Sequence, residues 1–391
     1  MTATPSTPPR HPKSLRAKLG LAVGAVLLTV LGLEVGFRIA GIDGQYYAPR
    51  VDQVQPGPDD SLEAIPHGFI PGATLTSKYD TDPRGTFGPD ATVAHTFNSA
   101  GWRDQEHSER KPRNVFRILG LGDSYLFGQG IRQEDICLNV LGETLQEDDT
   151  RTIECINTGV SGFNTSNQRD LLMARGFGYD PDLVVVFFVL NDVESNRNRS
   201  ARRVEFFRDY TTIYQQKDTL SHYSNLWSWA RQRVILAMRA SEYTQECVAG
   251  FAQDSGKWQQ CRSALANIWW ECKQRNVGML VAIFPFFVDL DGDYPFQEIH
   301  DRVRLFCEET GIDVIDLRNA YRDYNGPELW VHPTDQHPNE KAHEIAAEAI
   351  AEYLRRPDVD LLKRPRRPTT KTEGPTTDSP SVRRTPAQGL L

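Results

Sequence analysis

Ser124 lies where the sequence predicts that a buried strand gives way to a helix. The apolar stretch Phe116–Leu121 stops at Gly122-Asp123-Ser124, and a helix-compatible segment follows. In open α/β sheets, ligands bind at the carboxyl ends of the strands. A serine there can act as a nucleophile, and N–H groups at the helix start can stabilise an oxyanion. Gly, Asp and Ser are also ordinary turn residues, so a plain turn is the alternative.

A candidate base and acid stand together near the end of the chain. The segment HPTDQHPNEKAH holds Asp335 and His337 on one short loop before a predicted helix. An acid beside a histidine can bond its Nδ1 and leave Nε2 free to face a serine. His343 is expected on the helix face, and His332 has no acid correctly placed before it. We therefore take His337 as the candidate base, the alternative being a solvent-exposed loop histidine.

Two middle segments supply candidate hydrogen-bond donors. The segment Asn157–Gly162 ends the second predicted strand, and its glycines allow backbone N–H groups to approach a ligand closely. Asn191 follows the third predicted strand, where its side-chain amide can donate to the same oxyanion. Each segment alone is as consistent with a turn as with a site. Together with Ser124 and His337, they place four chemical groups on one rim of the sheet.

These four blocks together resemble the SGNH hydrolases, the GDSL-type esterase superfamily, over roughly residues 115–354. The blocks occur in order as GDSY, NTGVSGFN, VLND and DQHPN. The resemblance implies that Ser124 is the nucleophile, His337 the general base and Asp335 its orienting partner. It also implies an oxyanion hole made by the Ser124 N–H, the Gly162 N–H and the Asn191 amide.

Two departures from the family pattern bear on the site. Val189 stands where the third block usually has glycine, and we expect it to narrow the pocket. In the family the acid usually stands three residues before the histidine, a position that Thr334 occupies in this chain. Asp335 stands one residue nearer to His337. A backbone carbonyl is therefore the alternative partner for the His337 imidazole.

The predicted elements that position these groups indicate an α/β fold. Continuous apolar runs such as DLVVVFFVL are typical of strands buried on both faces of a parallel sheet. The strands are predicted at Phe116–Leu121, Thr152–Asn157, Leu183–Leu190, Met279–Phe284 and Val314–Leu317. The crossover helices are predicted at Asp135–Leu145, Asn167–Phe177, Pro295–Glu309 and Asn339–Tyr353. This alternation predicts a three-layer α/β/α sandwich with a five-stranded parallel sheet, flavodoxin-like as in the SGNH hydrolases.

The amino-terminal region contains a candidate membrane span. Leu19–Leu33 is almost unbroken in its apolar character and follows Arg10, Lys13, Arg16 and Lys18. Counting to residue 41 gives about the length that crosses a bilayer. The basic flank should stay cytoplasmic, which places the rest of the chain outside the cytoplasm. We favour an uncleaved signal anchor, because no small-x-small pattern closes the run. A cleaved signal peptide and a buried helix are the alternatives.

Composition divides the chain into five zones. Residues 1–18 form a basic cytoplasmic stub, residues 19–41 the anchor, and residues 42–113 a stalk with a few irregular strands. The hydrolase domain is expected over residues 114–356, and residues 357–391 are expected to be disordered because they are rich in Pro, Thr and Arg. Residues 193–256 form an insertion whose aromatic side chains can serve as a lid, although we favour core packing for them.

The bulk properties exclude some partners. The net charge is −8, which argues against nucleic-acid binding. No metal or organic cofactor is expected, because hydrolysis through an acyl-serine needs none. No cysteines form a Cys-x-x-Cys metal or redox pair, and the Asp289–Asp293 segment lacks the Glu of a calcium loop. Cys247, Cys261 and Cys272 crowd one region, where a disulfide and buried thiols are equally consistent with the sequence.

The sequence therefore favours a membrane-anchored serine esterase that lies outside the cytoplasm. Its partners would be the membrane and an ester substrate, with short acyl groups on envelope carbohydrate preferred. Two alternatives use the same residues or the same fold. One is an O-acyltransferase that passes the acyl group to a polysaccharide hydroxyl, and the other is an inactive SGNH-like scaffold that binds glycan.

Overall fold

Five strands in the middle of the chain form the parallel sheet that carries the candidate site. In the computed structural model, residues 15–42, 50–52, 69–193 and 218–363 are described. The sheet order is β5-β4-β6-β7-β8, and every neighbouring pair is parallel. The strands are β4 (Val115–Gly122), β5 (Thr152–Asn157), β6 (Leu183–Val189), β7 (Gly278–Phe284) and β8 (Asp313–Asp316).

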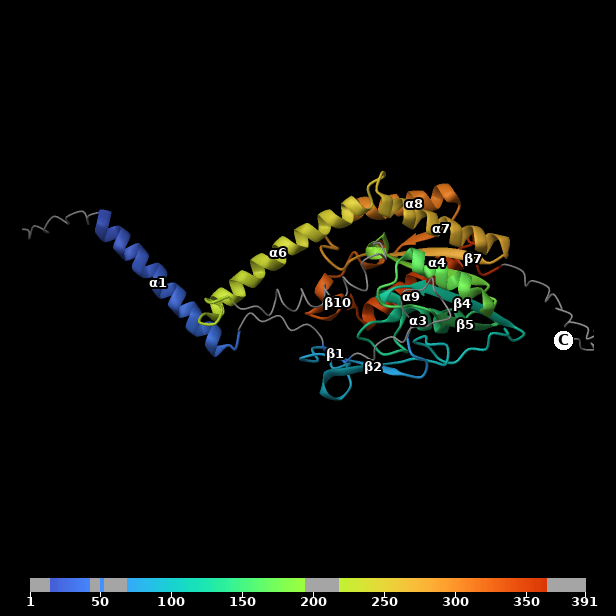
Figure 1. Ribbon diagram of the computed structural model, residues 1–391, viewed down its shortest axis with the longest axis horizontal. Coiled ribbons are helices and arrows are strands. Elements are labelled where there is room, and N and C mark those ends of the chain that lie inside the picture. The colour runs from blue at the N-terminus through green and yellow to red at the C-terminus, as the bar shows by residue number, and fades with distance from the viewer. Residues whose placement is uncertain (1–14, 43–49, 53–68, 194–217, 364–391) are drawn as a thin grey trace, which may run out of the picture.

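Helices cover both faces of this sheet, so the predicted three-layer architecture is confirmed. One face is covered by α4, α7 and α8, and the other by α3 and α9 (Figure 1). The central strand β6 is fully buried along its whole length, as its continuous apolar sequence predicts. The helices of these layers are α3 (Cys137–Gln146), α4 (Thr165–Ala174), α7 (Gly256–Gln274), α8 (Gln297–Thr310) and α9 (Glu340–Arg355).

Short elements complete the rim of the sheet where the four blocks lie. The single-turn helix α2 (Ser124–Phe127) follows β4, and the antiparallel pair β9 (Trp330–His332) and β10 (Asp335–Pro338) precedes α9. Among the described residues, the 3-10 helices are η1 (Pro89–Ala91), η2 (Gly176–Tyr179), η3 (Leu190–Val193), η5 (Leu317–Tyr321) and η6 (Gly326–Leu329).

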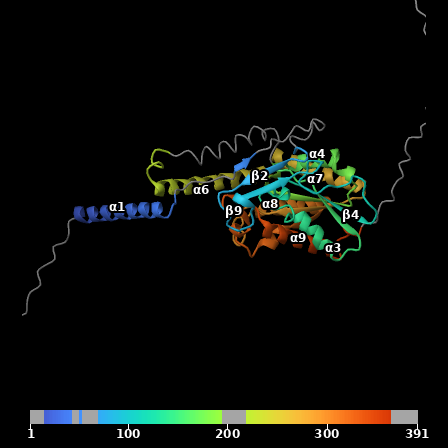
Figure 2. The ribbon, with the colours of Figure 1, turned by 90° about the horizontal axis from the view of Figure 1, so that it is seen from below.

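The region expected to be a stalk contains a small antiparallel sheet. Its strands are β1 (Arg50–Asp52), β2 (Thr74–Lys78) and β3 (Thr92–Thr96), in the order β1-β2-β3. Figure 2 shows β2 crossing the body of the molecule close to the end from which α6 extends. Tyr79, Trp102 and Arg103, which follow these strands, are buried against the sheet domain. The described part of this region is therefore joined to the domain by packed side chains.

Two long helices extend away from the sheet. The helix α1 (Leu15–Ile39) has no buried residue and is long and apolar enough to span a bilayer, a property that signal sequences share. The helix α6 (Asn225–Gly250) leads from the sheet domain to the carboxyl end of α1 (Figure 1). The expectation that the aromatic residues of the insertion pack in the core is wrong for Tyr223, Trp227 and Trp229, which are exposed. Those at 206, 207, 210 and 214 lie outside the described residues.

Two further expectations are resolved by burial. All six cysteines are buried as thiols, which fits the second of the two readings that the sequence left open. The packing of the domain continues beyond the expected boundary at residue 356, because Val359 and Leu361 are buried. The rest of the expected tail, from residue 364, lies outside the described residues.

Candidate active site

Ser124 is the first residue of α2, directly after the carboxyl end of β4. The preceding residue Asp123 caps this turn, because its Oδ1 accepts a hydrogen bond of 2.9 Å from the Tyr125 N–H. Gly122 is required by close packing, since a Cβ at this position would lie 2.6 Å from the Leu126 Cβ. The strand, the cap and the glycine together hold the Ser124 hydroxyl at the rim of the sheet.

The structure brings His337 and Asp335 to Ser124. His337 Nε2 lies 2.9 Å from Ser124 Oγ, and His337 Nδ1 lies 2.5 Å from Asp335 Oδ1. Both residues belong to β10, and side chains two positions apart on a strand point to the same face. Asp335 therefore reaches the imidazole of His337, although the spacing between the two residues departs from the family pattern. A carboxylate rather than a backbone carbonyl pairs with Nδ1.

The charges of the pair favour a basic imidazole and an ionised carboxylate. Burial alone would lower the pKa of His337, but the charge and hydrogen bond of Asp335 raise it above its ordinary value. Burial would raise the pKa of Asp335, yet the positive charge and hydrogen bonds of His337 and a bond from Tyr79 lower it. The arrangement can take a proton from Ser124 and stabilise the imidazolium that forms.

Tyr79 holds the second oxygen of Asp335, a contact that sequence reasoning missed. Its hydroxyl donates a hydrogen bond of 2.8 Å to Asp335 Oδ2 from the end of β2. The ring is buried and stacks on Phe87 at a centroid distance of 4.6 Å. Tyr79 and Asp335 are 256 positions apart, and the sequence around Tyr79 carries no signal of a site. The amino-terminal sheet therefore helps to complete the site.

Asn191 lies beside the turn that carries the serine. Its Nδ2 donates a hydrogen bond of 3.1 Å to Asp123 Oδ2, from η3 after β6. A carboxamide nitrogen carries two N–H donors, so this bond leaves one donor for another acceptor. Val189, which was expected to narrow the pocket, is fully buried in the core and does not line an open surface.

The loop that carries Gly162 follows β5 and contacts α2. The Val160 N–H donates to the Gly122 carbonyl at 3.2 Å, and a Cβ on Gly159 would lie 2.6 Å from the Phe127 nitrogen. Gly162 has a φ of 85°, a conformation that favours glycine. The loop is thus fixed at Gly159 and Val160 against the turn that carries Ser124, with Gly162 two residues further on.

Buried Arg103 braces the turn after Ser124 from the amino-terminal region. Its guanidinium donates to the carbonyls of Phe127, Gly128 and Ile131, the first at 2.8 Å and the last at 2.5 Å. Carbonyls at the end of a single helical turn otherwise lack partners. Arg103 therefore satisfies these acceptors and fixes the segment that follows Ser124.

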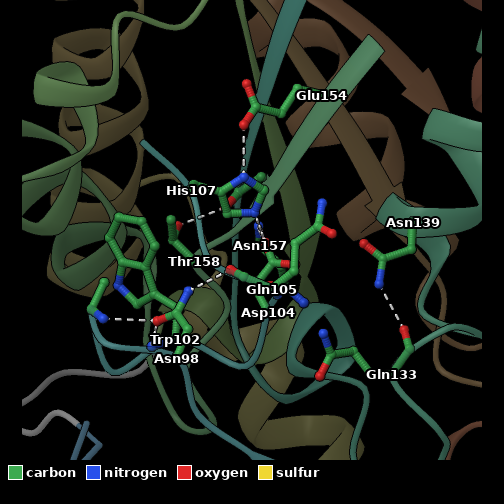
Figure 3. A network of polar contacts seen from close by, with 12 residues as sticks. Asn98, Trp102, Asp104, Gln105, His107, Gln133, Asn139, Glu154, Asn157 and Thr158 are labelled. Atoms are coloured by element: carbon green, nitrogen blue, oxygen red, sulfur yellow. Dashed lines mark hydrogen bonds and ion pairs between the residues drawn. The ribbon is translucent and has the colours of Figure 1, made fainter. Parts of the chain in front are cut away.

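A charged network holds the start of the Gly162 loop (Figure 3). His107 lies between two carboxylates, 2.9 Å from Asp104 Oδ2 and 2.8 Å from Glu154 Oε1. Asp104 Oδ2 also accepts a hydrogen bond of 2.6 Å from the backbone N–H of Asn157, the last residue of β5. Asn157 in turn bonds the Gly159 N–H through its Oδ1 and the Leu126 carbonyl through its Nδ2. The network therefore ties the end of β5 to both loops of the site.

This network makes the stability of the fold depend on pH. Burial would lower the pKa of His107, but hydrogen bonds and charges of Asp104 and Glu154 raise it from 6.5 to about 9. Its contribution to stability is therefore fully present below about pH 6.5 and is lost as the pH rises through about 9. A shift of this size corresponds to about 3 kcal/mol at most.

We expect the Tm of the wild type to fall relative to that of His107→Gln as the pH rises from 6 to 10. Differential scanning calorimetry of both proteins across this range measures the difference. His222→Gln changes an exposed histidine and serves as the control. A constant difference in Tm between the wild type and His107→Gln would contradict the expected pH dependence.

The sequence over this region matches a known family. The chain matches the GDSL-like Lipase/Acylhydrolase family over residues 121–345, which is more than half of its 391 residues. The chain belongs to this family. The match spans Ser124, Asp335 and His337, so the predicted family is confirmed, and with it a serine hydrolase that acts on ester bonds.

Part of this chain is similar to solved structures at low sequence identity. A catalytic mutant of the acetylxylan esterase Axe2 from Geobacillus stearothermophilus is 16% identical with a TM-score of 0.40, covering 62% of this chain and 96% of that one. The lipase/acylhydrolase from Enterococcus faecalis is 15% identical with a TM-score of 0.38, covering 61% and 95%. The esterase EstA from Pseudoalteromonas sp. is 15% identical with a TM-score of 0.36, covering 61% and 99%. Among curated proteins, no match was found.

Proposed function

We propose that this family member is a membrane-anchored esterase that uses Ser124 as its nucleophile. Ser124 Oγ attacks the ester carbonyl while His337 Nε2, 2.9 Å away, accepts the hydroxyl proton. Asp335 holds the proton on Nδ1 and stabilises the imidazolium. The imidazolium then gives its proton to the leaving alcohol, and an acyl-serine forms. Water, activated by the same imidazole, attacks this ester and regenerates Ser124. The Ser124–His337–Asp335 geometry is the observation that carries the proposal.

The oxyanion of each tetrahedral intermediate needs donors that are already in place. We assign this role to the Ser124 N–H, the Gly162 N–H and the second N–H of Asn191 Nδ2. The bond from Asn191 to Asp123 supports the assignment, because it fixes the carboxamide beside the nucleophile's turn. The anchored loop at Gly159 supports the same role for Gly162.

The anchor places the enzyme at a membrane. Helix α1 has no buried residue, and Arg16 and Lys18 stand at its amino end. Positive flanks stay on the cytoplasmic side, which supports a catalytic domain outside the cytoplasm. The side chains next to Ser124, namely Tyr125, Leu126 and Phe127, are buried in the core. With the side chains of this turn buried, we propose short acyl groups as the substrate, such as those on envelope carbohydrate.

A serine-directed fluorophosphonate tests the nucleophile directly. We expect the full-length protein in detergent to be labelled at Ser124, with the label located by peptide mass spectrometry. A panel of aryl esters of increasing acyl length should show the highest kcat/KM for acetyl or propionyl. Adding a sugar acceptor separates hydrolysis from acyl transfer, because transfer yields acyl-sugar in place of free acid. Absence of labelling at Ser124 in folded protein would overturn the proposal.

Tyr79 is expected to act as a positioning residue for Asp335. A hydrogen bond to a charged group contributes about 1.5–3 kcal/mol, so Tyr79→Phe should lower kcat by about tenfold or more with little change in KM. Steady-state kinetics on an acetyl ester measures both constants.

A matched control is available elsewhere in the fold. The Tyr353 hydroxyl also donates to an aspartate, Asp313, at 3.3 Å, and the Tyr353→Phe variant should keep the wild-type kcat. Equal kcat values for the two variants would show that the Tyr79 bond does not position the acid.

A further inference from the structure

The carboxyl end of α1 is bonded to the amino end of α6. Glu34 Oε2 accepts hydrogen bonds from Ser224 Oγ at 2.8 Å and from the Leu226 N–H at 3.0 Å, and its Oε1 accepts from the Asn225 N–H at 3.1 Å. A carboxylate of α1 therefore caps the first turn of α6, where N–H groups lack helical partners and a negative charge is stabilising.

Two neighbouring contacts of α1 reinforce this junction. Arg38 donates to Glu34 Oε1 at 2.6 Å and to the Tyr223 carbonyl at 2.5 Å. The Phe37 ring packs edge-on against Trp229 with a centroid distance of 5.5 Å. The start of α6 is thus fixed at the level of the last turns of α1.

Large apolar side chains are exposed around the junction and along α6. Trp227, Val234 and Met238 are spaced by seven and four residues, so they share one face of the helix. Val234 and Met238 are each 59% exposed and Tyr223 is 74% exposed. We call the exposed apolar side chains of the junction and of α6 together the α6 apolar surface. Its members are Leu220, Tyr223, Trp227, Trp229, Val234 and Met238, of which Trp229 lies on another side of the helix and packs against Phe37 of α1.

The position of the junction on α1 identifies what covers this surface. A span needs about 20 residues to cross a hydrocarbon layer of about 30 Å, so a span that begins at Leu19 reaches its far boundary near Arg38. Trp and Tyr side chains are favoured at this boundary, and an arginine there can extend its charge to the headgroups. Glu34, Arg38 and the side chains around Trp229 therefore lie at the membrane–water interface.

We propose that the α6 apolar surface lies in the interfacial layer of the membrane that α1 spans, with lipid as its partner. The inference rests on the proposed anchoring of α1. It follows from continuity, because α6 begins where the span ends and presents apolar side chains there. Helix α6 has 26 residues, or about 39 Å, and its other end reaches the sheet domain. Contact between α6 and the lipid would hold the catalytic domain in one orientation toward the membrane surface.

Lipids with brominated acyl chains test contact with this surface. The full-length protein is reconstituted in phosphatidylcholine vesicles with or without such lipids, and flotation and tryptophan fluorescence are measured. Bromine quenches only tryptophans that contact the acyl chains. Replacing both tryptophans, as Trp227→Phe with Trp229→Phe, should lower the quenched fraction of the emission by at least half. Trp270→Phe removes an exposed tryptophan on α7, away from α1 (Figure 1), and should leave quenching unchanged.

The outcomes separate this proposal from those on which it rests. Loss of flotation in the wild type would overturn the anchor, and failed fluorophosphonate labelling would overturn the esterase. Flotation with equal quenching in the wild type and the double variant would overturn the lipid contact alone.

A spin label gives an independent measurement that does not depend on the tryptophan variants. A nitroxide attached to Met238→Cys should be more accessible to oxygen than to a water-soluble nickel chelate, because oxygen concentrates in lipid. The same label at Leu305→Cys, an exposed apolar position on α8, should show the opposite preference. Equal preferences at the two positions would also overturn the proposal.

Discussion

Ser124→Ala is expected to lower kcat/KM for an acetyl ester by about 10⁴-fold or more. Removing a serine nucleophile leaves only the rate that the oxyanion donors and substrate binding provide. The variant should keep its fold, because the Ser124 hydroxyl bonds His337 at the rim and packs no core group. Initial rates on a chromogenic acetyl ester measure the loss, and circular dichroism reports the fold.

A matched serine separates the catalytic effect from a general one. Ser263 lies exposed on α7 and bonds only the Gln259 carbonyl of its own helix among its described contacts. Ser263→Ala should keep the wild-type kcat/KM. The assignment of Ser124 would be wrong if Ser124→Ala hydrolysed the ester at a rate within tenfold of the wild type.

The fold was predictable because strands that are buried on both faces have continuously apolar sequences. Strand β6 is apolar at all seven positions and every one is buried, as a strand covered on both faces requires. The order of the blocks placed Ser124 and His337 at the same rim, since parallel strands end at one edge. Local sequence could not decide what pairs with His337. That depended on β10 being extended, which puts Asp335 on the same face.

Other parts of the site depend on contacts that no local pattern records. Tyr79 reaches Asp335 only because the amino-terminal sheet packs onto the domain. The sequence of that region predicted a stalk instead. The aromatic residues of α6 were misread for a related reason. We favoured core packing for them, but aromatic side chains in a sequence do not themselves show whether they meet the core, lipid or water. Trp227 and Trp229 are exposed in the structure.

Asp335→Asn is expected to lower kcat/KM by about 10³- to 10⁴-fold and to shift its pH dependence. An amide that donates to His337 Nδ1 leaves the proton on Nε2, where the ring cannot accept the proton of Ser124. The pH effect has a definite sign. The charge of Asp335 raises the pKa of His337, and the base acts only when it is neutral. The acidic limb of kcat/KM should therefore lie above pH 6.5 in the wild type and move to lower pH in the variant.

Rates on the acetyl ester from pH 5 to 9 measure both effects, and Asp358→Asn supplies the control. Asp358 pairs with Arg356 on the surface, and its loss should change neither the rate nor the limb. A general loss of stability in Asp335→Asn would lower the rate without moving the limb, whereas loss of the carboxylate charge moves it. An acidic limb that stayed at the wild-type pH would show that Asp335 does not set the basicity of His337.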